Sequence, residues 1–173
     1  MPYTANVDQG SYPNAAEAAA LSGELYIATF FQTIGGAANG FYSLSVFNPS
    51  NSGKNVRVRA IRGWLSGAAP LLYLFKTTSN PTLANAFTPI NQRFGGAASA
   101  VSCTYNSASG GISFPGATNI DTDIQPSSST VELLPTDDDF YILPNGIASG
   151  IQVVQFVGNS QQYGFTMKWS EAS

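Results

Sequence analysis

The stretch FYSLSVFNPSNSGKNVRVRAI, residues 41–61, carries the pattern that decides the fold of this chain. In its first part, apolar residues alternate with serines, as expected of a strand that buries one face. Its centre, NPSNSGK, is rich in residues that favour tight turns. After the turn, valines and arginines alternate, at Val56, Arg57, Val58 and Arg59. We predict a strand, a tight turn and a second strand that pairs with the first as a hairpin.

Similar β-rich runs, separated by turn residues, continue on both sides of this stretch. They lie at 24–34, 54–65, 70–78, 130–134, 139–143, 150–158 and 162–170. We expect 24–34 to pair with 41–47 through the glycine-rich connection GGAANG. Ile61 and Trp64 break the alternation of their strand, which indicates a bulge or a bend. The last run is the most regular, and its apolar face consists of Tyr163, Phe165, Met167 and Trp169.

These patterns predict an all-β fold. About eight or nine strands, with turn signals every ~8 to 12 residues, are typical of a sandwich or barrel. We predict an antiparallel β-sandwich that is jelly-roll-like, with another antiparallel sandwich as the alternative. Residues 23–173 would form this single domain, preceded by an extended N-terminal arm at 1–22. The piece NAAEAAAL at 14–21 gives the arm a short helix, which is too short to be stable without a surface to lie on.

Residues 79–129 form the least regular part of the chain. A compact domain rarely contains a structureless segment of this length, so we expect one or two strands within it and long loops at one end of the sandwich. Val101, Cys103 and Tyr105 alternate with small polar residues, and 111–116 is a candidate edge strand. Cys103 is the only cysteine, which excludes an internal disulfide, and we interpret it as a buried structural thiol.

Charged residues are scarce. Of the 173 residues, 43% are hydrophobic and only 10% are charged, against roughly 25% charged in typical globular proteins. A surface rich in neutral hydroxyl and amide groups suits a subunit that is packed against other subunits. The net charge of −3 disfavours nucleic acid as a partner, and no run approaches the ~20 apolar residues of a membrane span. The start of the chain lacks the features of a secretory signal, so we expect synthesis in a cytoplasm.

The chain has no histidine, which removes the commonest general base and the commonest metal ligand. A carboxylate pair and a Ser–Lys arrangement are the catalytic devices that remain. The candidate carboxylates are Asp121, Asp123, Glu132, Asp137, Asp138 and Asp139. We interpret Asp121 and Asp123 as solvated or turn-capping residues, with Ca²⁺ binding as the weaker alternative, and the other three aspartates as residues that bond to turn amides. We therefore predict a protein that is not an enzyme and that holds no metal and no cofactor.

Positive charge is concentrated in one strand and the turn before it. Four of the seven basic residues lie there, at Lys54, Arg57, Arg59 and Arg62. In the simpler interpretation, these arginines face solvent and pair with carboxylates of an adjacent strand. In the functional interpretation, they dock onto an acidic or hydroxyl-rich protein, because arginine is enriched at interfaces.

Two segments resemble a known family. YSLSVFNPSNSGKNVRVRAI at 42–61 and ILPNGIASGIQVVQFVGNSQQYGFTMKWSE at 142–171 look like the small β-sandwich proteins of tailed-bacteriophage virions, in particular capsid cement, or decoration, proteins. The resemblance implies a non-enzymatic subunit, typically a homotrimer, on the outer surface of a capsid in the virion. There it would bind the major capsid protein and tie neighbouring coat subunits together. The residues that we expect to contact the partner are Tyr3, Tyr12, Arg57 and Arg59.

Two other functions stay open. A phage tail or fibre module, or a free carbohydrate-binding domain, would use exposed aromatic residues in the loops of 79–129 to stack on glycans. A carboxylate-dependent glycosidase on the same sandwich would need an Asp or Glu pair ~5 to 10 Å apart in a cleft.

Overall fold

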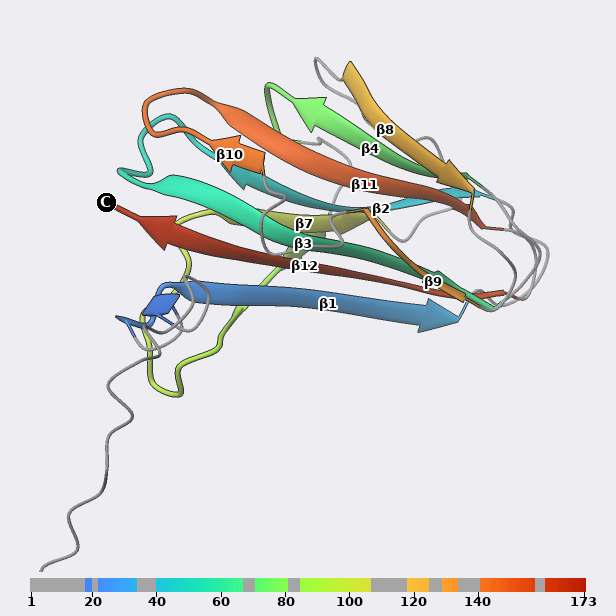
Figure 1. The fold of residues 1–173 in the computed structure, drawn as a ribbon, viewed down its shortest axis with the longest axis horizontal. Helices are drawn as coiled ribbons and strands as arrows, with labels where there is room; N and C mark the ends of the chain where they lie inside the picture. The colour runs from blue at the N-terminus through green and yellow to red at the C-terminus, as the bar shows by residue number, and fades with distance from the viewer. Residues whose placement is uncertain are drawn as a thin grey trace, which may run out of the picture.

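The computed structural model describes residues 18–19, 22–33, 40–66, 71–80, 85–106, 118–124, 129–133, 141–157 and 161–173. Two antiparallel sheets pack face to face in this part of the chain (Figure 1). The predicted all-β sandwich is thus confirmed. Within the described ranges, no helix has the length and apolar character that a bilayer crossing requires.

Each sheet contains six strands. The first, sheet A, has the order β10 (Tyr141–Leu143), β3 (Asn55–Leu65), β12 (Gln162–Ala172), β1 (Leu25–Thr33) and β6 (Ile90–Asn91), and β9 (Ser129–Glu132) also pairs with β3. The second, sheet B, has the order β5 (Asn85–Phe87), β7 (Ser102–Asn106), β2 (Gly40–Asn48), β11 (Ser149–Val157), β4 (Leu71–Thr77) and β8 (Thr118–Ile124).

The order of the strands is that of a jelly roll. Strands from the first half of the chain pair with strands from its end, so that β1 lies beside β12, β2 beside β11, β3 beside β10 and β4 beside β8. Along the chain, β1, β2, β3 and β4 alternate between sheet A and sheet B. This arrangement buries one face of each sheet against the other and makes nearly every pairing long-range in sequence.

The predicted hairpin at 41–61 is wrong in its pairing, although its two strands are present. Strand β2 belongs to sheet B and β3 to sheet A, so the connection 49–54 crosses from one sheet to the other. The turn chemistry is as expected: Ser52 N donates to Pro49 O at 3.0 Å, and Gly53 has a φ of 70°. A connection of this length can span the ~10 Å between packed sheets, and neighbours elsewhere in the chain supply the hydrogen bonds of each strand.

The predicted pairing of 24–34 with 41–47 is wrong for the same reason. Strand β1 pairs with β12 and β6, whereas β2 pairs with β11 and β7 in the opposite sheet. Alternation of apolar and polar residues shows which face of a strand is buried. Strands of both sheets show this alternation, so it does not reveal the sheet to which a strand belongs.

The core between the sheets follows the predicted apolar faces. Tyr163, Phe165, Met167 and Trp169 are all buried, as the last strand of the sequence predicted. The Trp169 ring stacks on Tyr26, with ring centroids 6.0 Å apart. Cys103 is a free, buried thiol, as predicted, and burial raises its pKa to about 12. The predicted irregularity in β3 is also confirmed, because the β12–β3 register shifts between Lys168 and Trp169.

Several predictions for the middle and the start of the chain need correction or lie outside the described residues. Asp121 and Asp123 lie in β8, paired with β4 at the edge of sheet B, and not in a turn. Charged residues are common on such edges because they hinder pairing with other chains. The short strands β5 and β6 were not predicted either. The parts outside the described residues are Tyr3, Tyr12, 1–17, 20–21, 111–116 and Asp137, Asp138 and Asp139.

Candidate functional site

The two sheets differ in how much of their outer face is accessible. On sheet B, several side chains that alternate with the core, including Ser43, Gln152 and Val154, are buried, although Phe41 is 42% exposed. On sheet A, Phe31 and Ile142 are each 58% exposed and Ile90 is 65% exposed. Among the described residues, sheet A thus exposes more large apolar side chains than sheet B does.

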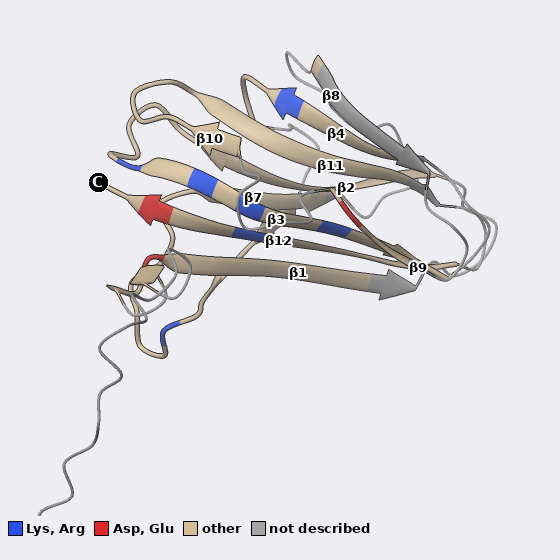
Figure 2. Ribbon diagram, in the orientation of Figure 1, with Lys and Arg blue, Asp and Glu red and all other residues tan. Residues whose placement is uncertain are grey.

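A group of basic side chains, here called the basic patch, occupies the half of sheet A nearest to the start of β1. It consists of Arg57 and Arg59 on β3 and Lys168 on β12. Figure 2 shows these blue segments on neighbouring strands. The β-bulge turns Arg59 toward β12, where its Nε donates to Ser170 Oγ at 3.2 Å. Arg57 is partly exposed on this face, whereas Arg59 is buried at 8% exposure, so the predicted solvent-facing position is not seen for Arg59.

Exposed apolar residues frame the basic patch. Ile142 on β10 pairs with Arg57, and Ile90 on β6 pairs with Ile27 at the other edge of the sheet. Phe94, in the turn after β6, is fully exposed. The yellow-green segment that holds it extends below β1 in Figure 1, beside the start of the described chain. Apolar contact area thus surrounds positive charge on this side of the molecule.

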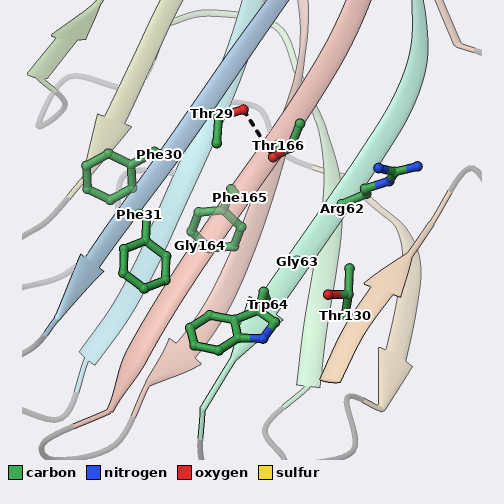
Figure 3. Close-up of a pocket in the computed structure, with 10 residues that line it drawn as sticks. All are labelled: Thr29, Phe30, Phe31, Arg62, Gly63, Trp64, Thr130, Gly164, Phe165 and Thr166. Carbon is green, nitrogen blue, oxygen red and sulfur yellow. Dashed lines mark hydrogen bonds between the residues drawn. The ribbon is translucent and has the colours of Figure 1, made fainter. Parts of the chain in front are cut away.

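A hollow of about 280 Å³ lies near the other end of the same face. Phe31, Gly164 and Trp64 form one row across β1, β12 and β3. The rings of Phe31 and Trp64 lie with centroids 5.3 Å apart, tilted by 34°, and Gly164 lies between their strands (Figure 3). We call this feature the aromatic hollow.

Polar groups line one side of the aromatic hollow. Thr29 Oγ1 and Thr166 Oγ1 are 3.2 Å apart and share a hydrogen bond. Arg62 on β3 forms an ion pair with Glu132 on β9, and both side chains are partly exposed. For Arg62, the prediction of pairing with a carboxylate on an adjacent strand is therefore confirmed. Thr130 completes this side.

The sequence predictions did not identify the aromatic hollow. They placed the sugar-stacking candidates in 79–129, but Tyr105 of that region packs on Phe30 in the core, with ring centroids 4.4 Å apart. Two features of the sequence mark the position of the aromatic hollow. Trp64 breaks the alternation of its strand, and Gly164 interrupts a strand of larger residues. A glycine within a strand often marks a close approach of another group.

The acidic residues that the structure describes have structural partners. Glu171 is buried, and it accepts hydrogen bonds from Ser99 Oγ, from Ala100 N at 2.9 Å and from Trp169 Nε1 at 3.0 Å. These bonds hold the segment before β7 against β12. Among the residues whose side chains are described, no group of three or more His, Cys, Asp or Glu could hold a metal ion. Asp121 and Asp123 are not in that set, because only their backbone is described.

Comparisons with protein-family models, with curated proteins and with solved structures gave no match. The surface of sheet A therefore supplies the observations on which a function can be based. This surface has exposed apolar residues, positive charge at one end and the aromatic hollow at the other.

Proposed function

We propose that this chain is a non-enzymatic structural protein of a phage virion, which binds the outer surface of the capsid and reinforces the contacts between coat subunits. The observation that carries the proposal is the basic patch, framed by exposed Ile90 and Ile142 on an accessible sheet face. The resemblance of 42–61 and 142–171 to capsid decoration proteins supports the same function.

The charge of the patch indicates the chemistry of its partner. The whole chain has a net charge of −3, yet one half of one face holds the partly exposed cations Arg57 and Lys168, with the buried Arg59 beside them. A coat surface that presents carboxylates would complement this half and repel the rest of the molecule, which fixes the orientation of docking. The exposed isoleucines add apolar area, worth roughly 25 cal/mol per Å² buried.

Several weak attachments would combine into a firm one. We propose a homotrimer, in which each copy contributes one basic patch, together with arm residues such as Tyr3 and Tyr12. Linked sites raise the overall affinity by about 10² to 10⁴ over a single site when the geometry allows them to bind together. Such a subunit needs no deep pocket and no reactive group.

The decisive experiment is co-sedimentation with capsids that lack this protein. The test variant is Arg57→Glu with Lys168→Glu, and the matched control is Lys76→Glu on sheet B, which changes an exposed cation on the other side of the molecule. We expect the double variant to bind at least tenfold more weakly, wild-type binding to fall as salt rises, and the control to bind normally. Equal binding by the double variant and the control would contradict the docking surface.

The arm and the oligomer are tested separately. Deletion of residues 1–22 should leave a folded oligomer that no longer binds capsids, and normal binding by this truncated chain would exclude the role of the arm. Light scattering of the purified protein measures the oligomeric state, for which the proposal requires a mass of three chains.

A phage tail or fibre module, or a carbohydrate-binding module, is the second candidate function. The specific observation in its favour is the aromatic hollow, which lies apart from the basic patch on the same face.

A further inference from the structure

We propose that the aromatic hollow is a binding site for one neutral pyranose ring of a glycan. The site is formed by the rings of Phe31 and Trp64 over Gly164, with Arg62 and the threonines as its polar side. The proposal does not depend on capsid binding, because none of these residues belongs to the basic patch.

The apolar side of the hollow exists because residue 164 has no side chain. A Cβ at this position would lie 3.1 Å from Phe30 O and 3.1 Å from Phe31 Cδ2, so even alanine would crowd the Phe31 ring. With glycine there, the two rings lie above the backbone of β12, where Phe31 is 58% exposed and Trp64 is partly exposed. Pyranose rings present a face of C–H groups that packs on such aromatic surfaces.

The polar side matches the edge of a sugar. Arg62 offers N–H donors, and the Thr130 hydroxyl both donates and accepts. The Thr29 and Thr166 hydroxyls each donate and accept, and their shared 3.2 Å hydrogen bond holds them at the rim of the hollow. Sugar hydroxyls are donors and acceptors at once, so a rim that contains both kinds of group can satisfy several of them in one orientation.

The charge of the hollow selects against anionic ligands. Arg62 is the one cation among the lining residues, and Glu132 already neutralises it. The Arg62–Glu132 ion pair leaves no unpaired positive charge among the lining residues to attract a phosphate or a sialic acid. A neutral sugar does not need such a charge to bind. The volume of about 280 Å³ lies just below the ~300 to 1,000 Å³ of pockets for drug-sized ligands, and so suits one ring of an oligosaccharide.

The position of the hollow allows glycan binding and docking to occur together. Strand β1 begins at Leu25, near the start of the described chain (Figure 1), and its Phe31 lines the hollow. Six steps along a strand at ~3.3 Å each separate these positions by roughly 20 Å. A subunit fixed at the basic patch could thus present the hollow to a second surface.

Intrinsic fluorescence provides a direct assay. The chain has two tryptophans, Trp64 in the hollow and Trp169, which is completely buried. We would titrate the full chain with maltose, cellobiose, lactose and N,N′-diacetylchitobiose, and with sialyllactose as the acidic comparison. At least one neutral disaccharide should produce a saturable change in Trp64 emission and should protect it from acrylamide quenching, with Kd on the order of 1 mM, as suits an open site.

Three variants test the geometry. Trp64→Ala and Phe31→Ala each remove one ring, and Gly164→Ala keeps both rings but crowds the space between them. Binding of the same disaccharide, measured by calorimetry, should weaken about tenfold or more in each. Phe94→Ala, which removes an exposed ring outside the hollow, is the control and should bind as the wild type does. Circular dichroism of each variant verifies that it is folded.

The proposal is overturned if none of the neutral disaccharides gives a saturable signal at 100 times the expected Kd, or if the folded Trp64→Ala variant binds normally. Preference for sialyllactose would also refute it, since it would reverse the charge argument. Loss of self-association or of capsid binding in Trp64→Ala, without any sugar binding by the wild type, would identify the hollow as a protein interface. Capsid sedimentation in parallel separates this failure from a failure of the proposed function.

Discussion

Asn48 offers the sharpest test of how the fold is held together. It is the last residue of β2, it is completely buried, and its Nδ2 group donates to Lys54 O at 2.8 Å, Leu143 O at 3.0 Å and Pro144 O at 3.1 Å. One side chain thus links the β2–β3 connection to the β10–β11 connection. Both connections cross between the sheets, so Asn48 fastens two crossings at once.

The cost of removing this amide can be worked out from its contacts. An amide NH₂ has two hydrogens, so the three acceptors share about two full hydrogen bonds, each worth a net ~0.5 to 1.5 kcal/mol. The bond to Leu143 O is buried, and an unsatisfied buried carbonyl costs roughly 1 to 3 kcal/mol. Since these terms overlap, we expect Asn48→Ala to lower the free energy of unfolding by about 2 to 4 kcal/mol.

Asn48→Asp sharpens the test, because it is nearly isosteric and replaces the donor with an oxygen. The three carbonyl oxygens would repel the negative charge of the introduced carboxylate. Its pKa in the folded protein should therefore lie above the ~3.9 of an unfolded aspartate. A raised pKa in the folded state contributes stability that is present below the unfolded pKa and lost as the pH rises. The Asp variant should therefore lose stability from pH 4 to 7, by up to ~1.4 kcal/mol per pH unit, relative to the Ala variant.

Urea unfolding at a fixed protein concentration provides the measurement, because an oligomer makes the midpoint depend on concentration. With a slope m of ~2 kcal/mol per M, Asn48→Ala should lower the midpoint by about 1 to 2 M. Asn51→Ala, an exposed residue in the same connection, is the control and should stay within ~0.5 kcal/mol of the wild type. If Asn48→Ala behaves like this control, the inference that Asn48 secures the two crossings is incorrect.

Three further predictions concern the core and its edges. Glu171→Gln puts an NH₂ group in place of one of the two oxygens that accept from Ala100 N–H and Trp169 Nε1–H. It should lower the free energy of unfolding by about 1 to 3 kcal/mol, measured by urea unfolding. An unchanged midpoint would show that these bonds contribute little. Gly63→Ala would place a Cβ 2.8 Å from Leu72 Cδ1 and should destabilise the fold by roughly 1 to 3 kcal/mol. Combined with Leu72→Ala, it should cost less than the sum of the two single variants. A fully additive loss would contradict the clash. Burial raises the pKa of the Cys103 thiol from 9.0 to about 12, so its contribution to stability is complete below pH 9 and is lost as the pH rises through this window. Stability in this window should fall less steeply, by up to ~1.4 kcal/mol per pH unit, in Cys103→Ala than in the wild type, and parallel pH profiles would exclude this role.

The docking surface and the aromatic hollow differ in how far they could be predicted. Arg57 and Arg59 are close in one strand, so the local pattern predicts that they share a face, but Arg59 is the bulged residue opposite Lys168 and Trp169 and is buried. Phe31, Trp64 and Gly164 come from three strands that are far apart in the sequence. Their common row depends on the register of β1, β12 and β3, which no local signal specifies.

The sequence by itself determined most of the long strands, their buried faces and the turn at 49–54, but not β5, β6 or β8. The alternation of 162–170 placed Trp169 in the core, and the residues of 48–54 specified a turn, because side-chain period and backbone preference are local properties. Only the tertiary structure decided that β2 and β3 lie in opposite sheets and pair with β11 and β12. The same turn can join a hairpin or a crossing between sheets, and the choice depends on burial and on hydrogen bonds such as those of Asn48 with Leu143 and Pro144, which exist only once distant segments have come together.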